Sequence, residues 1–212
     1  MVPAMRTTTK PVLGPRSAGV YAILLVLIAA GTALAAVVLL VLGVTRDAAD
    51  VTVHLTDAVR LDLGERLDLP DGAGLLGNLV PVGLHVPDLP MGLRLLAQLG
   101  PALVLLSVSA GALALVQVLR TVRAGRPFAR HNPTALVVVA VAVLVGGGVA
   151  PVVSGAAALA ALDHLGLAGD GSPFLTLSSF SLAPVLVAVL LLGIAEAFRR
   201  GAAMADDMAG LV

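Results

Sequence analysis

Four long apolar runs dominate the pattern of hydrophobic and polar positions along this chain. None of them contains Asp, Glu, Lys, Arg or His, and they extend over residues 18–44, 95–119, 134–162 and 174–195. Each exceeds the roughly 20 helical residues that are needed to cross the hydrocarbon core of a bilayer. The pattern therefore predicts an all-α membrane fold, a bundle of four transmembrane helices.

The first run also admits a second interpretation, because basic residues followed by an apolar core are typical of a secretory signal peptide. The tripeptide Ala33–Ala35 would be a suitable cleavage site. However, apolar residues continue for nine positions beyond it, whereas a secretory core usually has only about 7–15 apolar residues in all. We therefore expect an uncleaved span. Cleavage would instead leave three spans and an N-terminus outside the cell.

The distribution of basic residues predicts the orientation of these helices. Arginine and lysine gather in the N-terminal tail, between the second and third runs, and after the fourth run, whereas the two other connections are net acidic. Basic segments stay on the cytoplasmic side of a membrane, so both termini are expected there. The predicted segments are a cytoplasmic tail (1–17), a span (18–44), an outer loop (45–92), a span (93–122), a cytoplasmic arginine-rich connection (123–133), a span (134–162), an outer loop (163–173), a span (174–198) and a cytoplasmic tail (199–212).

Alternating residues within the loop 45–92 predict a small extracytoplasmic β unit. Polar and apolar residues alternate in VTVHLT (51–56) and again in residues 59–63, as in half-buried strands. A third candidate, 80–86, contains Pro81 and is followed by a second proline, which suits an edge strand or an extended tether. Two or three strands are marginal alone in water, so we expect this sheet to lean on helix ends, lipid headgroups or another chain.

Proline and glycine interrupt three of the apolar runs. Pro101 lies in the first turn or two of the second predicted helix, where proline is tolerated. Residues 146–151 (GGGVAP) break the third run near its middle, and Pro184 breaks the fourth. Paired broken helices are one signature of a transporter's binding site. The alternative is a kink with close helix packing through small residues.

Composition narrows the classes of protein to which the chain can belong. It is 58% hydrophobic and 12% charged, whereas a soluble domain is about half apolar and about a quarter charged. The formal net charge of zero disfavours direct binding of nucleic acid. The absence of Cys excludes disulfides and thiolate metal sites. The apolar runs also lack the ionisable groups that ion-coupled carriers and proton channels need.

The residue pattern predicts no catalytic, cofactor-binding or metal-binding residue. His54, His85 and His164 lie in the predicted outer segments, each near an Asp, but their spacing resembles no ligand motif. No nucleophile elbow, phosphate loop or catalytic zinc motif occurs in the sequence. We therefore expect a protein that is not an enzyme and that uses no cofactor.

Two predicted cytoplasmic stretches carry the candidate interaction residues. In the connection, Gly125 suits a helix C-terminal cap, and Asn132 before Pro133 suits the N-cap of the next helix. Phe128 is expected at headgroup level, with neighbouring arginines facing anionic lipid phosphates. The candidate residues are Arg123, Gly125, Arg126, Pro127, Phe128, Arg130, Asn132, Glu196, Phe198, Arg199, Arg200, Gly201, Asp206 and Asp207.

These two stretches end on the same predicted side of the membrane. Glu196 has the helical spacing to pair with Arg199 or Arg200, and Asp206 and Asp207 follow if the helix continues. We hypothesise that the arginine-rich connection contacts Glu196, Asp206 or Asp207 and so fixes the C-terminal tail. The alternative is that its arginines only set the topology and contact lipid.

The same two stretches resemble segments of a bacterial membrane family, the domain of unknown function 2975. GRPFARHN (125–132) is similar to the family's G-x-P-F…N segment. AEAFRRGAAMADDMAGLV (195–212) is similar to its closing segment, an apolar helix followed by an E-x-F-R-x-G-like run, an acidic pair and a short apolar end. The resemblance implies a bacterial inner-membrane protein. Because members are often encoded beside small helix-turn-helix regulators, it also implies membrane-linked regulation, and it assigns no catalytic residue.

The sequence thus predicts a non-enzymatic sensor or regulatory membrane protein. Its outer unit would meet a ligand or partner, while the basic connection and tail would face anionic lipid headgroups and a cytoplasmic regulatory protein. A homo-oligomer is a further expected assembly, and direct contact with nucleic acid is not expected. The alternatives are a small transporter or transport-complex subunit that uses the kinked third and fourth helices, and a structural role in the envelope.

Overall fold

The computed structural model of the chain is mostly helical, with one small sheet. It describes residues 15–55, 81–126, 129–169, 172, 174–175 and 181–209. Among these residues, three helical segments are long and apolar enough to cross a membrane, as in a multi-pass membrane protein: Gly19–Thr45, Met91–Arg123 and Asn132–His164.

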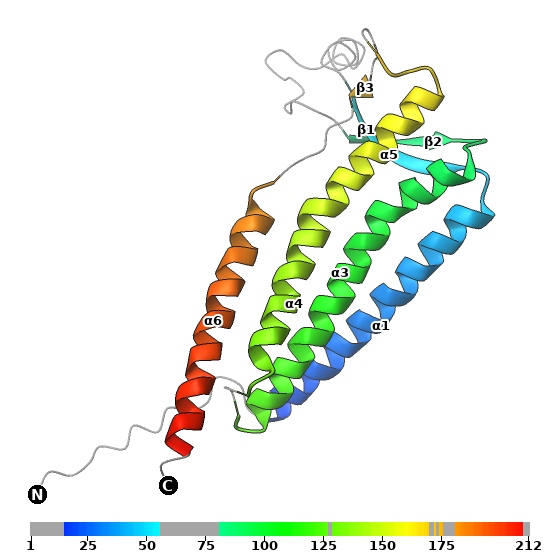
Figure 1. Ribbon diagram of the computed structural model, residues 1–212. Coiled ribbons are helices and arrows are strands. Elements are labelled where there is room, and N and C mark those ends of the chain that lie inside the picture. The colour runs from blue at the N-terminus through cyan, green and yellow to red at the C-terminus, as the bar shows by residue number, and fades with distance from the viewer. Residues whose placement is uncertain are drawn as a thin grey trace, which may run out of the picture.

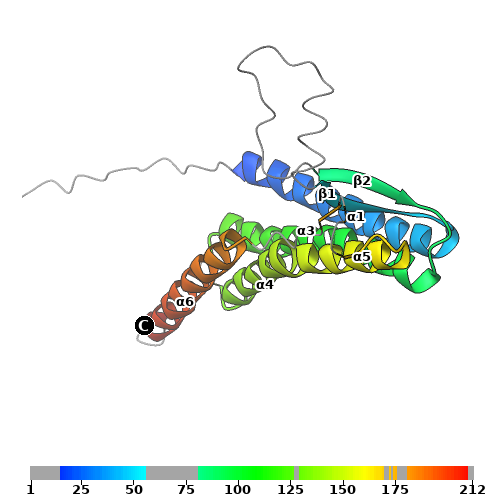
Figure 2. The same cartoon turned by 90° about the horizontal axis from the view of Figure 1, so that it is seen from above.

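The helices lie side by side in chain order, as an open row rather than around a central axis (Figures 1 and 2). The first helix packs on the second, the second on both halves of the third span, and the first half of that span on the last helix. The elements are α1 (Pro15–Thr45), β1 (Ala49–Leu55), β2 (Pro81–Val86), α3 (Met91–Arg123), α4 (Asn132–Leu144), the π-helical segment η1 (Val145–Val149), α5 (Ala150–His164), β3 (Phe174–Leu175) and α6 (Ala183–Ala209).

The two ends of the row differ in structure (Figure 1). The three strands gather at one end, which we call the sheet end. The start of α1, the turn between α3 and α4 and the C-terminus of α6 lie at the opposite end, which we call the connection end. The arginine-rich turn after α3 and the charged end of α6 therefore both lie at the connection end, away from the sheet.

Small residues at seven-residue spacing let the outer helices approach their neighbours. The buried positions of α1 include Ala29, Ala36 and Gly43, which form one stripe along the helix. The buried positions of α6 repeat the pattern with Ala188, Ala195 and Ala202. Such small-residue stripes are typical of membrane helix pairs, in which close backbone contact and interhelical hydrogen bonds drive association. Accordingly, the Ser109 hydroxyl of α3 donates to the Ala29 carbonyl oxygen of α1, at 2.9 Å.

The sheet has the strand order β2-β1-β3, and both pairings are antiparallel. The prediction of a small β unit is confirmed, as is the edge position of the proline-containing strand β2. The candidate strand 59–63 lies outside the described residues. The third strand, Phe174–Leu175, was not predicted, since it comes from the start of the fourth apolar run. A short apolar segment does not distinguish a strand from a helix by its pattern alone.

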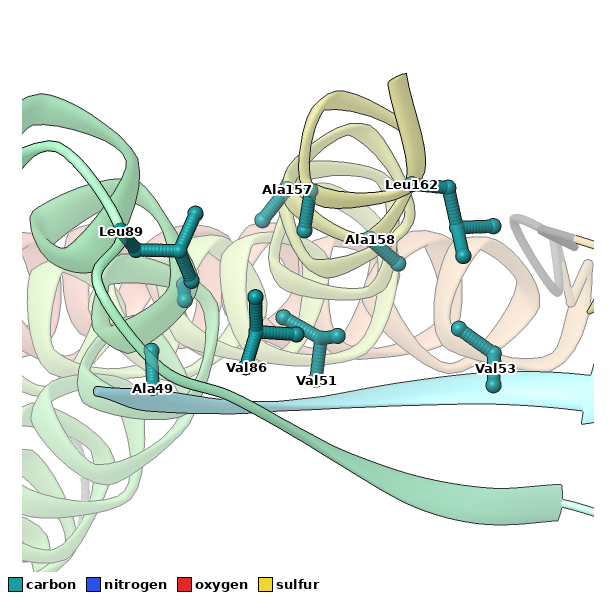
Figure 3. Packing of buried hydrophobic residues seen from close by; sticks show 10 residues of the cluster. Ala49, Val51, Val53, Val86, Leu89, Ala157, Ala158 and Leu162 are labelled. Atoms are coloured by element: carbon teal, nitrogen blue, oxygen red, sulfur yellow. The ribbon is translucent and has the colours of Figure 1, made fainter. Parts of the chain in front are cut away.

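The sheet packs directly on the ends of two helices, as predicted from the marginal stability of so few strands. Val51 and Val53 of β1 are buried, whereas Thr52 between them is exposed. Figure 3 shows these valines pointing at Ala158 and Leu162 of α5. The cluster comprises Ala49, Val51, Val53, Val86, Leu89, Ala97, Ala157, Ala158, Ala161 and Leu162. The sheet and the ends of α3 and α5 therefore share one core.

Two predicted helix boundaries differ from the structure. The second helix begins at Met91, four residues before its apolar run, so Pro101 lies in its interior rather than in its first turns. The last helix begins at Ala183 rather than at Phe174. Pro184 is therefore in its first turn and does not interrupt it. Proline is well suited to a first turn, where its missing N–H would have no helical partner.

The predicted break in the third span is confirmed as a π-helical segment, Val145–Val149, between α4 and α5. Its three consecutive glycines weaken the regular helix, and Pro151 has no N–H to donate to the preceding turn. The start of α6 lies against this segment, because a Cβ on Gly147 would approach Pro184 Cγ to 2.6 Å. Since η1 is central in the span Asn132–His164, α6 begins at about mid-depth of that span.

Candidate functional site

The turn that follows α3 is built as the sequence predicts. Gly125 has a φ of 71°, a left-handed conformation that glycine adopts without steric cost. The Arg126 N–H donates to the Thr121 carbonyl oxygen and the Gly125 N–H donates to the Val122 carbonyl oxygen, each at 3.0 Å. This pair of bonds is a Schellman motif, which satisfies the last free carbonyls of a helix. Gly125 therefore turns the chain sharply at the connection end.

Asn132 has a different role from the one predicted. It is the first residue of α4 rather than its N-cap, because His131 holds the cap position without a capping side-chain bond. The Asn132 side chain is fully buried, and its Oδ1 lies 2.8 Å from the Thr121 hydroxyl of α3. The amide therefore joins the end of α3 to the start of α4. Sequence reasoning missed Thr121, because a threonine near a helix end carries no distinctive signal.

We expect Asn132→Ala to destabilise the protein by about 1–2 kcal/mol, because it removes a fully buried side chain and its hydrogen bond between two helices. The Thr121 hydroxyl keeps the Val118 carbonyl oxygen as its acceptor. The free energy of unfolding in detergent micelles, from a denaturant titration, is the measurement. Thr134→Ala, at an exposed position two residues later, is the control and should change it by less than about 0.5 kcal/mol. Equal effects of the two variants would contradict the role given to Asn132.

The charged part of α6 begins after its apolar stretch ends at Ala195. Glu196 accepts bonds from Arg199 Nε and Nη2, at 2.7 and 2.8 Å, and from Arg200 Nε at 2.8 Å. These hydrogen bonds, from Arg199 first and then Arg200, lower the pKa of Glu196 to about 2. The carboxylate is thus ionised at neutral pH and is held by arginines of its own helix. The helix continues through Gly201, as the predicted position of the acidic pair requires.

The hypothesised contact between the connection and the tail stays a prediction. Asp206 and Asp207 lie in the last turns of α6, but their side chains, together with Pro127 and Phe128, lie outside the described residues. Of the three acids proposed as contacts, Glu196 is occupied by Arg199 and Arg200. The other candidate interaction residues lie at two places, the turn after α3 and the charged part of α6. Arg123, Arg126 and Arg130 are exposed at the turn between α3 and α4, and Phe198 is half-buried on α6.

A second charged site, at the sheet end, was missed in the sequence. The Arg94 side chain is only 12% exposed, and its Nη1 donates to Asp47 Oδ1 at 3.0 Å and to the Arg46 carbonyl oxygen. It therefore joins the start of α3 to the segment after α1. Arg94 stands one position before an apolar run and inside the predicted span 93–122, but nothing in the residue pattern indicated Asp47 as its partner.

The three histidines near the sheet end do not converge on a metal site within the described part of the chain. His85 Nδ1 lies 2.7 Å from Asp50 Oδ1 across the β1–β2 pair, and both side chains are exposed. His54 is on β1 and His164 is the last residue of α5.

A cavity of about 360 Å³ lies at mid-depth of the helices, beside η1. Its lining is almost entirely apolar, with the Ser107 hydroxyl group as its polar side chain. The lining residues are Val104, Ser107, Val108, Gly111, Ala112, Val139, Ala142, Val143, Gly146, Gly147 and Pro184. The two breaks noted in the sequence, GGGVAP and Pro184, therefore meet at one place, which the sequence did not show.

We expect Gly147→Ala to destabilise the α6–η1 contact by about 1 kcal/mol or more, because its Cβ would lie 2.6 and 2.9 Å from two atoms of the rigid Pro184 ring. Gly148→Ala is a matched control, since a Cβ there meets nothing within 4 Å. Disulfide cross-linking between engineered cysteines on α4 and α6 reports the contact. A cross-linking rate that falls equally in both variants would contradict the packing described.

Comparisons with known proteins add no relative. No family model matches the chain, no curated protein matches it, and no solved structure matches it. The resemblance to the domain of unknown function 2975 therefore rests on the sequence, chiefly on the two motifs in residues 125–132 and 195–212, and it stays a prediction.

Proposed function

We propose that this chain is a non-enzymatic sensor or regulatory protein of the bacterial inner membrane, crossing it four times with both termini in the cytoplasm. In this arrangement the sheet end is extracytoplasmic and the connection end is cytoplasmic. The charge distribution supports this orientation, since Arg120, Arg123, Arg126 and Arg130 lie at the connection end without an intervening acid. The fourth crossing is proposed from the apolar run 174–195 of the sequence, since the apolar part of α6 alone, about 20 Å long, is shorter than a bilayer core.

The observation that carries the proposal is the shared core of the sheet and the ends of α3 and α5. A ligand or partner that shifted the sheet would shift these helix ends with it, because a close-packed core transmits displacement rather than absorbing it. The opposite end of α3 bears the Gly125 turn and its arginines. Binding outside would thus change the position of the basic connection inside, which is the surface that a cytoplasmic regulatory protein would read.

The orientation in the membrane is tested with single-cysteine variants. The introduced cysteine is the only thiol that the label can react with, because the sequence contains no Cys. Thr52→Cys on the exposed face of β1 and Ala129→Cys in the connection are labelled in intact cells with a membrane-impermeant maleimide. Labelling of Thr52→Cys alone is expected. Labelling of Ala129→Cys alone would indicate the opposite orientation. Labelling of both variants would show that no membrane separates the two positions.

The regulatory role is tested by affinity capture in mild detergent. A cytoplasmic protein should co-purify with the wild type and should be lost from the Arg126→Glu variant. Arg46→Glu, an equal charge change beyond the opposite end of α1, is the control and should retain that protein. If no captured protein distinguishes the two variants, the connection is not its docking surface.

A small transporter or a transport-complex subunit is the second candidate, favoured by one observation. The π-helical break and the start of α6 meet at the 360 Å³ cavity at mid-depth, as broken helices do in transporters. The purified chain in liposomes would then carry a solute. Flux that the cavity-filling variant Gly146→Leu abolishes would favour this function over the regulatory one.

A further inference from the structure

A groove of about 330 Å³ runs between α1 and α3 at the connection end. Its lining is mostly apolar residues of both helices, together with two arginines of α3. The lining residues are Gly19, Ala22, Ile23, Val26, Leu27, Leu119, Arg120 and Arg123. The groove begins where the close packing of α1 on α3 ends. Ala29, in the stripe of small residues, is buried against α3, whereas Ala22, seven residues earlier, lines the groove.

The two ends of the groove differ in polarity. Gly19 is at the charged end, because a Cβ on it would lie 3.5 Å from Arg123 Nη1. From there the groove extends along α1 to Leu27, about 12 Å at the helical rise of 1.5 Å per residue. The Arg123 guanidinium group thus stands at one end of a mostly apolar channel, and Arg120 lines the channel one helical turn away. This is the arrangement that an amphipathic ligand with a charged head requires.

The position of the arginines along α3 matches the level of lipid headgroups. Arg94 and Arg120 lie about 39 Å apart along the helix at 1.5 Å per residue, more than the hydrocarbon core of about 30 Å and within the roughly 40–45 Å of a bilayer that includes both headgroup regions. Arg94 is paired with Asp47 at the sheet end. At the other end, the Arg120 and Arg123 side chains are exposed, and neither forms an ion pair with a residue that the structure describes.

We propose that this groove binds one anionic phospholipid. Its headgroup phosphate lies between the Arg120 and Arg123 guanidinium groups, and one acyl chain lies against Ala22, Ile23 and Val26. Arginine suits this role because its planar fork of donors matches phosphate oxygens. Anionic lipids are enriched where basic juxtamembrane segments face the membrane surface, but the apolar groove makes this a site for a single molecule rather than a diffuse attraction. The proposal does not depend on the regulatory role.

The experiment is native mass spectrometry of the full-length protein released from micelles that contain phosphatidylglycerol or phosphatidylcholine in equal amounts. The wild type should retain one phosphatidylglycerol. Arg123→Gln should weaken retention about tenfold, the size of one lost charge-assisted hydrogen bond. Arg126→Gln removes the same charge three residues further on, outside the groove, and should leave retention unchanged.

A second variant separates the groove from the charge. Ala22→Phe fills the apolar channel, keeps both arginines and should also lose the lipid. Equal loss in Arg123→Gln and Arg126→Gln would overturn the proposal in favour of general surface charge. Equal retention of phosphatidylcholine, or full retention by Ala22→Phe, would overturn it as well. Thermal unfolding of each variant without added lipid shows that it is folded.

Discussion

Val53→Asp is expected to have one of the largest effects of any substitution at the sheet end, lowering the free energy of unfolding by about 3–5 kcal/mol. Val53 is fully buried and faces Leu162 of α5 within the shared core (Figure 3). A carboxylate there would lose its hydration, and the surrounding cluster is made of apolar residues. A buried, unpaired charge carries a penalty of this size.

The neighbouring position provides the control for this prediction. Thr52 is exposed on the opposite face of β1, so Thr52→Asp introduces the same charge into water and should change stability by less than about 0.5 kcal/mol. Denaturant titration in micelles and hydrogen exchange at the β1 amides measure the two variants. Similar effects of both would show that β1 does not present alternate faces to core and solvent.

Gly100→Val is expected to cost about 3 kcal/mol by separating α3 from α5. A Cβ on Gly100 would lie 2.0 Å from Ser154 Oγ, 3.1 Å from Ser154 Cβ and 3.1 Å from the Ala150 carbonyl oxygen. The hydroxyl can rotate away, but the other two contacts belong to the Cβ atom and the backbone of α5. The helix must therefore move, and overpacking of this kind is strongly destabilising.

Two companion variants make this prediction specific. Gly92→Val places the same residue on the same helix, where a Cβ meets nothing within 4 Å, and should have a much smaller effect. Combining Gly100→Ala with Ser154→Gly removes the closest contacts and should be more stable than Gly100→Ala alone. If Gly92→Val and Gly100→Val are equally destabilised, helix propensity rather than α3–α5 packing accounts for the loss.

Much of this fold was predictable from the sequence, because bilayer thickness and strand alternation impose simple patterns. The first three apolar runs and the strand around Val51 and Val53 appear as expected. The side-by-side arrangement of the helices in chain order was not predictable. The stripe of Ala29, Ala36 and Gly43 is nevertheless visible in the sequence as a seven-residue repeat of small residues. Close packing through such residues depends on which helix lies opposite, and the sequence of one helix does not identify its partner.

The misread positions are those where tertiary contacts decide between local alternatives. Phe174 begins an apolar run long enough for a helix, yet it pairs with Leu55 in the sheet. Asn132 before a proline has the signature of an N-cap, yet its amide faces Thr121 of the preceding helix. Arg94 was placed in the predicted span 93–122 without a partner, and only the packing at the sheet end brings it to Asp47. Each required knowledge of a partner distant in the sequence.

We propose that the sheet and the connection end move together through α3. Spin labels at Val20→Cys on α1 and Ala129→Cys in the connection would report their distance in nanodiscs by pulsed electron paramagnetic resonance. Loosening the sheet with Val53→Ala, which leaves a cavity in the shared core, should shift or broaden that distance distribution, whereas Thr52→Ala should not. An unchanged distribution in Val53→Ala, with its helix content intact, would contradict the claim.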